Sequence, residues 1–307
     1  MRVAFFGSPG FALPTLEAVR ERHEVVLVVA QPDKPAGRGM RKVAPAVAAY
    51  AREHDLPLSQ PARLKGNREF LEQLATLAPD VAITAAYGKI LRKELLDIPQ
   101  HGFLNVHGSL LPKYRGAGPV QWALINGERR TGVSIMRTDV GLDTGPVCLA
   151  RELAIDPDER APQLFARIAQ LGADALVEAL DLLEEGRLEC MPQDDALATE
   201  APLLSKSDGD VAWQRSAREI YDRFRGVYAW PGTRFEQAGR PVRVHEMRVV
   251  EGGAGQPGEV LSVQEGVVVA TGEDAVELLE VQPAGKGRMK ARDWANGYRV
   301  EVGDQLA

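Results

Sequence analysis

The sequence is poor in cysteine and has no long apolar run. Cys148 and Cys190 are its only cysteines, and neither belongs to a C-x-x-C pair. This scarcity argues against a disulfide scaffold and against a zinc site, and we expect both residues to act as small apolar side chains. Because no apolar stretch is long enough to span a bilayer, we expect no membrane partner. The first residues lead straight into a strand-like segment without the pattern of a targeting leader, which predicts a cytoplasmic protein.

Positive charge is not in excess either. The chain of 307 residues carries 37 Lys and Arg against 43 Asp and Glu, a formal net charge of -6. This total alone would disfavour a nucleic-acid partner. Salt screens charges beyond about 8 Å, however, so local clusters of basic residues decide whether a phosphate backbone is bound. The length favours two domains, and the apolar fraction of 45% is that of an ordinary globular protein.

Strand and helix patterns alternate in the first part of the chain. Residues 2–6 and 24–30 are apolar and strand-like, and residues 11–20 between them have helical spacing. Such a unit predicts a parallel sheet with a right-handed crossover. The turn after the first strand is not G-x-G-x-x-G, so a dinucleotide site is not expected. Further strands are predicted at 80–86, 132–138 and 147–154, and helices at 45–54, 64–78, 120–126 and 164–185. The fold class is therefore α/β, a Rossmann-like and mostly parallel sheet with helices.

The stretch NVHGSLLPKYRG concentrates groups that could carry chemistry. Asn105, His107 and Ser109 occupy alternate positions after a strand-like segment, so an extended backbone would place them on one face. An amide can donate to a developing oxyanion and an imidazole can exchange a proton, which suits acyl transfer. The structural alternative is an asparagine that caps a turn and a histidine satisfied in the core.

Together with the later segment GLDTG, this stretch resembles the folate-dependent formyltransferases. The resemblance implies that Asn105, His107 and Asp143 are the catalytic residues and that no metal takes part. From the sequence alone, Asp139 would be an equal candidate to Asp143. The resemblance assigns contacts with the donor, 10-formyltetrahydrofolate, to four neighbouring residues, Ser109, Leu110, Leu111 and Pro112.

Within the family, the chain is most similar to the members that formylate initiator methionyl-tRNA for translation initiation. The basic segment PAGRGMRK then resembles the loop that contacts the tRNA acceptor end, with Arg38, Arg41 and Lys42 as its cations. A positively charged loop can neutralise phosphates on binding, although composition alone would equally predict a solvated surface loop. The implied partners are initiator methionyl-tRNA and a tetrahydrofolate derivative, and we expect a monomer.

Three other functions stay open at this point. Members of the same family formylate an amino sugar or glycinamide ribonucleotide, and a hydrolase would release formate from formyltetrahydrofolate. A small acceptor, however, needs neither the basic loop nor a second domain. A non-catalytic tRNA-binding module is the third alternative, which the complete set of Asn105, His107 and Asp143 disfavours.

The last third of the chain has a different pattern. Residues 186–205 hold prolines and polar residues without a period, as a linker does. They separate a catalytic domain, 1–185, from a second domain, 206–307. After a helix at 217–224, short strands alternate with turns at 233–236, 242–249, 258–263, 266–271 and 275–281. This pattern predicts a small OB-like β-barrel with Trp213 and Trp230 as core residues.

Basic residues recur at alternate positions near the end of the chain. The residues are Lys286, Arg288, Lys290 and Arg292. In an extended segment they would form one basic ridge on the second domain. The first three are therefore candidate tRNA contacts, although a solvated edge strand protected by lysines would have the same sequence.

Overall fold

The computed structural model describes residues 1–36 and 41–307. These residues form two compact units. Unit 1 contains residues 1–119, 130–154 and 165–202, and unit 2 contains residues 120–129, 155–164 and 203–307. Two short segments that precede the expected linker thus group with the C-terminal residues.

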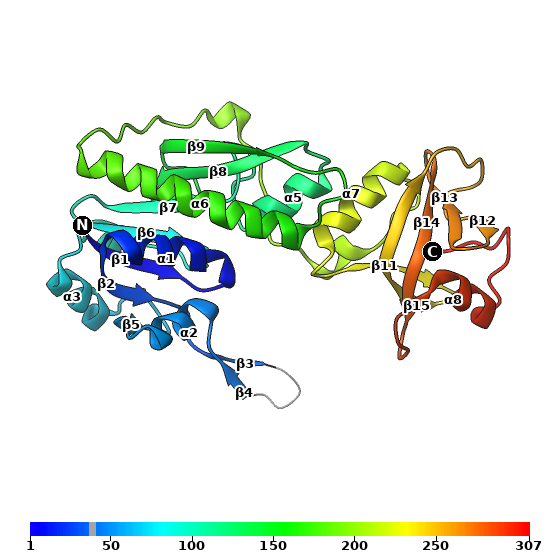
Figure 1. The fold of residues 1–307 in the computed structure, drawn as a ribbon, viewed down its shortest axis with the longest axis horizontal. Helices are drawn as coiled ribbons and strands as arrows, with labels where there is room; N and C mark the ends of the chain where they lie inside the picture. The colour runs from blue at the N-terminus through cyan, green and yellow to red at the C-terminus, as the bar shows by residue number, and fades with distance from the viewer. Residues whose placement is uncertain (37–40) are drawn as a thin grey trace. The chain divides into compact units, whose positions relative to one another are not determined.

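Unit 1 is built on a seven-stranded sheet in the order β5-β2-β1-β6-β7-β8-β9 (Figure 1). Its strands are β1 (Arg2–Gly7), β2 (Glu24–Val29), β5 (Leu58–Ser59), β6 (Val81–Ala85), β7 (Phe103–His107), β8 (Arg130–Arg137) and β9 (Val147–Ala154). The neighbouring strands β5, β2, β1, β6 and β7 pair in parallel with one another. β8 is antiparallel to β7, and β9 is antiparallel to β8. The predicted mostly parallel α/β sheet is confirmed.

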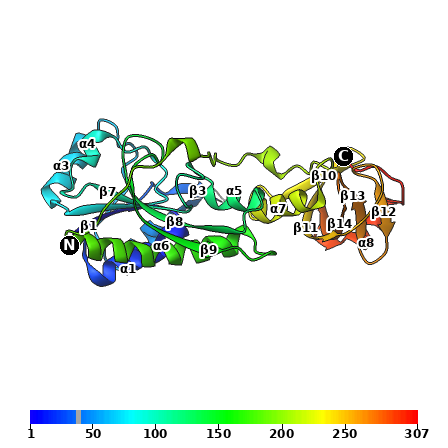
Figure 2. The same ribbon diagram turned by 90° about the horizontal axis from the view of Figure 1, so that it is seen from above.

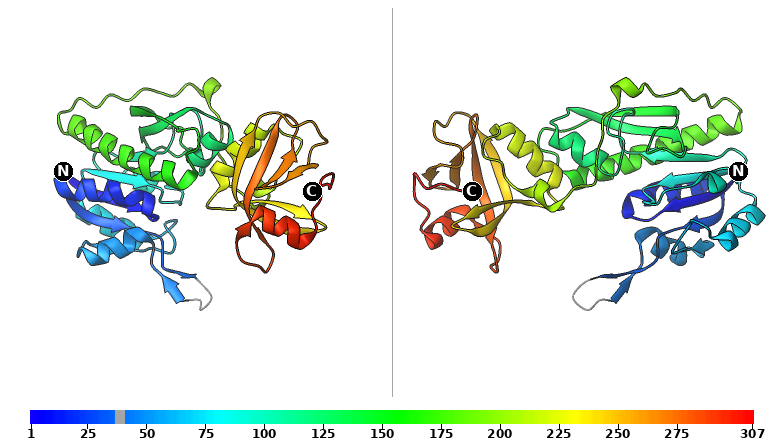
Figure 3. Two further views of the ribbon diagram at one scale, coloured as in Figure 1. Left: turned by 45° about the vertical axis from the view of Figure 1, so that its right-hand side comes forward. Right: turned by 180° about the vertical axis from the view of Figure 1, so that it is seen from behind.

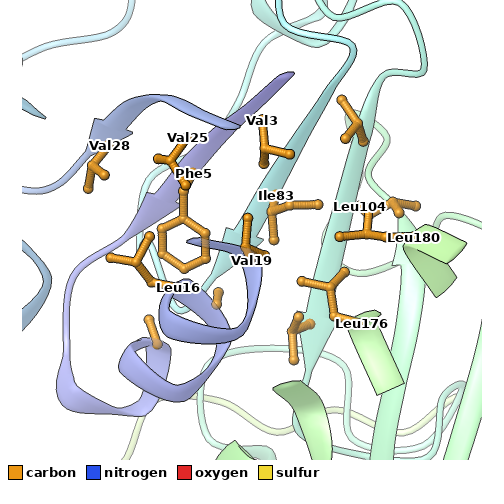
Figure 4. Close-up of a cluster of buried hydrophobic side chains, with 14 of the residues drawn as sticks. Val3, Phe5, Leu16, Val19, Val25, Val28, Ile83, Leu104, Leu176 and Leu180 are labelled. Atoms are coloured by element: carbon orange, nitrogen blue, oxygen red, sulfur yellow. The ribbon is translucent and has the colours of Figure 1, made fainter. Parts of the chain in front are cut away.

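Helices cover both faces of this sheet (Figure 2). They are α1 (Leu13–Arg22), α2 (Ala46–Glu53), α3 (Arg68–Leu77), α4 (Lys93–Leu96) and α6 (Ala161–Glu184), with a short 3-10 turn η1 (Gly10–Ala12) before α1. On one face, Val3 and Phe5 of β1 pack with Leu16 of α1 and Leu176 of α6 (Figure 4). On the other face, the alternate residue Phe6 packs with side chains of α3 and α4. Because successive side chains of a strand point to opposite faces, both faces are apolar, as in a buried parallel sheet.

The segment after β2 differs from the predicted loop. It contains the strands β3 (Lys34–Ala36) and β4 (Arg41–Val43), which pair in antiparallel fashion as a sheet of their own. The pairing was not visible in the sequence because glycine and proline obscure the strand pattern.

A disulfide joins Cys148 to Cys190, so the expectation that both act as apolar thiols was wrong. Cys148 lies on β9, and Cys190 follows α6 in a segment whose Met191 forms a bridge with Val147. The disulfide joins two residues separated by 42 positions, whose Cα atoms lie 3.9 Å apart. Sequence spacing could not reveal this return to β9.

Unit 2 is an antiparallel sheet with helices, consistent with the predicted small β-barrel (Figure 3). The strand order is β10-β11-β14-β13-β12, and β15 also pairs with β14. Its elements are α5 (Pro119–Ile125), η3 (Lys206–Gly209), α7 (Ala217–Val227), β10 (Thr233–Gln237), β11 (Arg240–Val250), β12 (Val260–Val263), β13 (Val267–Ala270), β14 (Ala275–Pro283), β15 (Met289–Lys290) and α8 (Ala291–Tyr298). Trp213 and Trp294 lie in its core with Phe224.

Trp230 is not a core residue, contrary to the prediction. It is 50% exposed, in the turn between α7 and β10. Two residues after Trp230, the backbone of Gly232 packs closely on Gly209. A Cβ on Gly209 would lie only 2.1 Å from the Gly232 oxygen. The tryptophan therefore stands outside the strand alternation that buries its neighbours Thr233 and Phe235.

Charged side chains stabilise the helical part of unit 2. Arg225 of α7 is 2% exposed and bonds Asp222 on the same helix, and its Nη1 donates to the Glu159 carbonyl at 3.0 Å. Arg160 pairs with Glu246 of β11 and lies over the ring of Tyr228 at 4.3 Å. Both the buried guanidinium of Arg225 and the partly exposed one of Arg160 thus have a carboxylate partner, which offsets the cost of desolvation.

Candidate active site

Asn105 and His107 lie on β7, next to the carboxyl end of β6. The register pairs Thr84 of β6 with Asn105, and the Thr84 hydroxyl donates to the Asn105 side-chain oxygen at 2.8 Å. Since an amide has its oxygen and nitrogen on opposite sides, this bond directs Nδ2 of Asn105 away from Thr84. Nδ2 is then 3.5 Å from Oδ1 of Asp143.

Asp143 comes from the loop between β8 and β9 and reaches both residues of β7. Its backbone has a φ of 53°, and its Oδ2 accepts from the Gly116 amide at 2.9 Å. The same oxygen is 3.6 Å from Nδ1 of His107. Asp139, which the sequence left as an alternative, instead accepts bonds from Thr144 within its own loop. The structure therefore brings Asp143, and not Asp139, to the pair on β7.

His107 is held between two acceptors. Its side chain is 6% exposed. Nε2 is 2.9 Å from the carbonyl oxygen of Tyr114, while Nδ1 faces Asp143. A ring that carries a proton on each nitrogen presents one N–H group to each of these oxygens.

Ser109 lies outside the strand that carries Asn105 and His107, so the single extended segment predicted for all three was wrong. The strand ends at His107, and the Ser109 hydroxyl turns into the next loop, where it donates to the Lys113 carbonyl at 2.6 Å. The hydroxyl of Ser134, on β8, also binds this loop. It donates to the Ser109 carbonyl at 2.8 Å and accepts from the Leu111 amide at 3.0 Å. The hydroxyl of Ser109 thus shapes the loop that carries Leu110 to Pro112.

Apolar side chains border this region. Leu111 and Pro112 line a cavity of about 330 Å³ together with residues of β9 and the segment 191–194. Val140 and Leu142, on the loop that leads to Asp143, are each 70% exposed. Exposed apolar residues beside a buried polar group are typical of a ligand site.

The predicted basic residues are distributed over several elements. Arg38 lies outside the described residues, Arg41 belongs to β4, and Lys42 of the same strand is exposed. Lys286 is exposed in the turn after β14, and Lys290 ends β15.

The single extended ridge predicted for the C-terminal cations was wrong. Arg292 lies in α8, because Ala291, Trp294 and Ala295 bury one face of a helix there. Arg288 forms ion pairs with Glu280 and Glu246. Of the predicted ridge, Lys286, Arg288 and Lys290 are at exposed positions outside the helix, and Arg288 is paired with acidic side chains.

Sequence reasoning missed the groups that hold the three side chains together. They are the Thr84 hydroxyl, the Tyr114 carbonyl, the Gly116 amide and, on the presumed linker, Gln193. Two of these, the Tyr114 carbonyl and the Gly116 amide, belong to the main chain. Only Gly116 had a signal in its residue type, since its φ of 121° and a Cβ position 2.7 Å from the Ala201 oxygen permit only glycine.

The described part of the chain holds neither a cluster of metal-ligand side chains nor a helix able to span a membrane. Among residues 1–36 and 41–307, no three His, Cys, Asp or Glu side chains are grouped as metal ligands would be. No helix in the same ranges has the length and apolar character needed to cross a membrane.

Solved structures share this fold at low sequence identity. An N-formyltransferase from Helicobacter canadensis, in complex with folinic acid and dTDP-3-aminofucose, superposes with a TM-score of 0.71 at 15% identity, over 92% of this chain and 99% of that one. HypX from Aquifex aeolicus, in complex with tetrahydrofolic acid, gives a TM-score of 0.62 at 18% identity, over 98% of this chain and 48% of that one.

Curated proteins are similar at much higher identity. The methionyl-tRNA formyltransferase of Thermus thermophilus is 53% identical over 307 residues, 100% of this chain and 99% of that protein. That of Deinococcus radiodurans is 52% identical over 303 residues, 98% of this chain and 94% of that protein. Residues 1–180 match the family model Formyl transferase, and residues 203–299 match Formyl transferase, C-terminal domain. With both models matched in order, and with such identity along its whole length, this chain belongs to the formyl transferase family.

Proposed function

We propose that this protein transfers the formyl group of 10-formyltetrahydrofolate to the free α-amino group of methionine on initiator methionyl-tRNA. The observation that carries the proposal is the meeting of Asn105, His107 and Asp143 in a chain 53% identical to a methionyl-tRNA formyltransferase. We further propose that unit 1 is catalytic, that unit 2 binds tRNA, and that the protein acts in the cytoplasm as a monomer.

In this mechanism Asn105 stabilises the charge that develops on the formyl oxygen. The donor supplies an activated formyl carbon, which the neutral amine of methionine attacks to form a new C–N bond. The Nδ2 of Asn105, directed by Thr84, donates to the resulting oxyanion. A donor placed in this way contributes about 3 kcal/mol to transition-state stabilisation.

His107 and Asp143 transfer the proton that the attacking amine loses. The attacking amine must lose one proton, and the leaving N10 of the folate must gain one when its bond to carbon breaks. We propose that His107, which lies between Tyr114 and Asp143, passes that proton. Asp143 orients the ring and stabilises it while it carries two protons. A positioned proton transfer contributes about 10² to 10⁴ in rate.

The donor's flat ring system needs apolar walls close to these groups. We propose that Leu110, Leu111 and Pro112 form one wall, on the loop that Ser109 closes through its bond to Lys113. The exposed side chains of Val140 and Leu142 are suited to contact the same ligand. Apolar walls with a few convergent polar groups are the usual composition of such sites.

For the tRNA, we propose contacts from Arg38, Arg41 and Lys42 on one unit and from Lys286, Arg288 and Lys290 on the other. Arg288 is the weakest of these candidates, because Glu280 and Glu246 already neutralise it. Arg38→Ala should weaken the use of tRNA and leave any folate hydrolysis intact. Equal damage to both activities would mean that the loop shapes the folate site instead.

One assay separates the proposed function from its alternatives. The protein is incubated with formyl-labelled donor and with Met-tRNA, an amino sugar nucleotide, glycinamide ribonucleotide or no acceptor. We expect label on Met-tRNA. Label on either small acceptor, or release as formate at the same rate without acceptor, would replace the proposal with the corresponding alternative.

A further inference from the structure

The residues that follow α6 pack onto the candidate active site. We call residues 190–201 the strap. At one end, Cys190 is bonded to Cys148 and Met191 pairs with Val147 of β9. At the other end, the Arg115 amide donates to the Thr199 carbonyl at 2.8 Å, and the Ala201 amide donates to the Arg115 carbonyl at 2.7 Å. The strap is thus attached both to β9 and to the loop that follows His107.

Between these ends, Gln193 connects the two loops of the site through every polar group of its side chain. Its Nε2 donates to the main-chain oxygens of Asp143 at 2.8 Å and Gly145 at 2.7 Å. Its Oε1 accepts from Nε and Nη2 of Arg115 at 3.0 and 2.9 Å. A carboxamide has two N–H groups and two lone pairs, so its hydrogen-bonding capacity is fully used.

Each of the two loops that Gln193 joins contributes a group to the candidate site. One loop holds Asp143 at a φ of 53°, in the left-handed region that few non-glycine residues adopt, although aspartate does so more often than most. The other loop supplies the Gly116 amide, next to Arg115, that donates to the Asp143 carboxylate at 2.9 Å. The distance from Asp143 to His107, 3.6 Å, therefore depends on how these loops are held.

We propose that Gln193 is a positioning residue for formyl transfer, which fixes the carboxylate of Asp143 against His107 by bonding the main chain of Asp143. The role rests on the proposed function, in which that carboxylate orients the imidazole. Only an amide suits the position. A glutamate would keep the bonds from Arg115 but would set an oxygen against the carbonyls of Asp143 and Gly145, and a methionine of similar shape would lose all four bonds.

The first test separates turnover from binding. Gln193→Met and Gln193→Glu are compared with wild type and with Glu189→Gln, a change at an exposed position one residue before the strap. We expect kcat for Met-tRNA formylation to fall about 10- to 100-fold in both Gln193 variants, since displacement of a reacting group by about 1 Å costs about a hundredfold. The KM for tRNA should change less than about twofold, because the strap is not among the proposed tRNA contacts. The Gln193→Glu variant serves alone if Gln193→Met does not fold.

A double-mutant cycle then asks whether Gln193 acts through Asp143. In an Asp143→Asn background, whose ring-orienting charge is already lost, Gln193→Glu should reduce kcat less than about twofold further. A loss of equal size in both backgrounds would show a merely structural role and overturn the proposal, as would unchanged kcat in the single variants. If wild type does not formylate Met-tRNA, the proposed function fails instead. If wild type does so and Asp143→Asn is impaired while the Gln193 variants are not, this inference fails alone.

Discussion

The Thr84 hydroxyl donates a hydrogen bond of 2.8 Å to the side-chain carbonyl oxygen of Asn105. Thr84 is 6% exposed and faces Asn105 through the parallel register of β6 and β7. The bond determines which end of the Asn105 amide points away from β6, and the nitrogen end lies on the side of Asp143. With its oxygen occupied, the amide presents N–H groups to a ligand, as an oxyanion donor must.

Replacement of Thr84 should therefore affect catalysis through Asn105. In Thr84→Val, which keeps the shape of the side chain, the amide of Asn105 can flip and present its oxygen. We expect kcat to fall about tenfold, which corresponds to the loss of about 1.4 kcal/mol from one hydrogen bond. Steady-state kinetics with Met-tRNA measures this change. Thr84→Ser, which keeps the hydroxyl, should retain most of the activity, and equal losses in the two variants would contradict the assignment.

The ion pair of Arg160 and Glu246 makes the stability of unit 2 depend on pH. The hydrogen bond from Arg160 holds the pKa of the Glu246 carboxyl below its usual value. A carboxyl whose pKa is lowered by folding stabilises the protein above its unfolded pKa of about 4.3, and this contribution is lost as the pH falls through the folded pKa.

We therefore predict that Glu246→Gln lowers the free energy of unfolding by about 1–2 kcal/mol at pH 7. The difference from wild type should shrink as the pH falls through the lowered pKa of the folded state, where the wild-type carboxyl is itself protonated. Urea unfolding at several pH values measures this difference. Glu251→Gln, at an exposed position, is the control and should differ little from wild type. A Glu246→Gln deficit that does not vary with pH would exclude the electrostatic explanation.

The Cys148–Cys190 bond should stabilise unit 1. It closes a loop across a separation of 42 residues, for which the chain-entropy model assigns about 4 kcal/mol. Reduction, or a Cys190→Ser change, should lower the free energy of unfolding by up to this amount. Mass spectrometry after alkylation without reductant shows whether the bond is present in the purified protein. Modification of both cysteines under native, non-reducing conditions would contradict the bond.

Sequence patterns predicted the fold well where burial imposes a period. The strands β1, β2 and β6 were recognised because their apolar runs are buried on both faces of the sheet. The strands β10 to β14 were recognised because turn residues lie between them. The pattern failed where contacts between distant residues decide the structure. Arg292 alternates with other cations as in a strand, but burial of Trp294 makes the segment helical.

The candidate site was predictable only in its side chains. Asn105, His107 and Asp143 could be named because their residue types suit the chemistry and their motifs resemble a family. The strap had no such signal, since residues 190–201 lack a period and resemble a linker. Several of its contacts are hydrogen bonds to main-chain atoms, such as that from Gln193 to the Asp143 carbonyl, and no local pattern encodes the acceptor.

Single-turnover formylation of Met-tRNA by Asn105→Ala and His107→Ala tests the central claim most directly, with binding of the folate measured in parallel. We predict that each change slows transfer at least about a hundredfold while the folate still binds, because each removes a group that acts on the transition state. A loss of tenfold or less in both variants would contradict the roles that we assign to them.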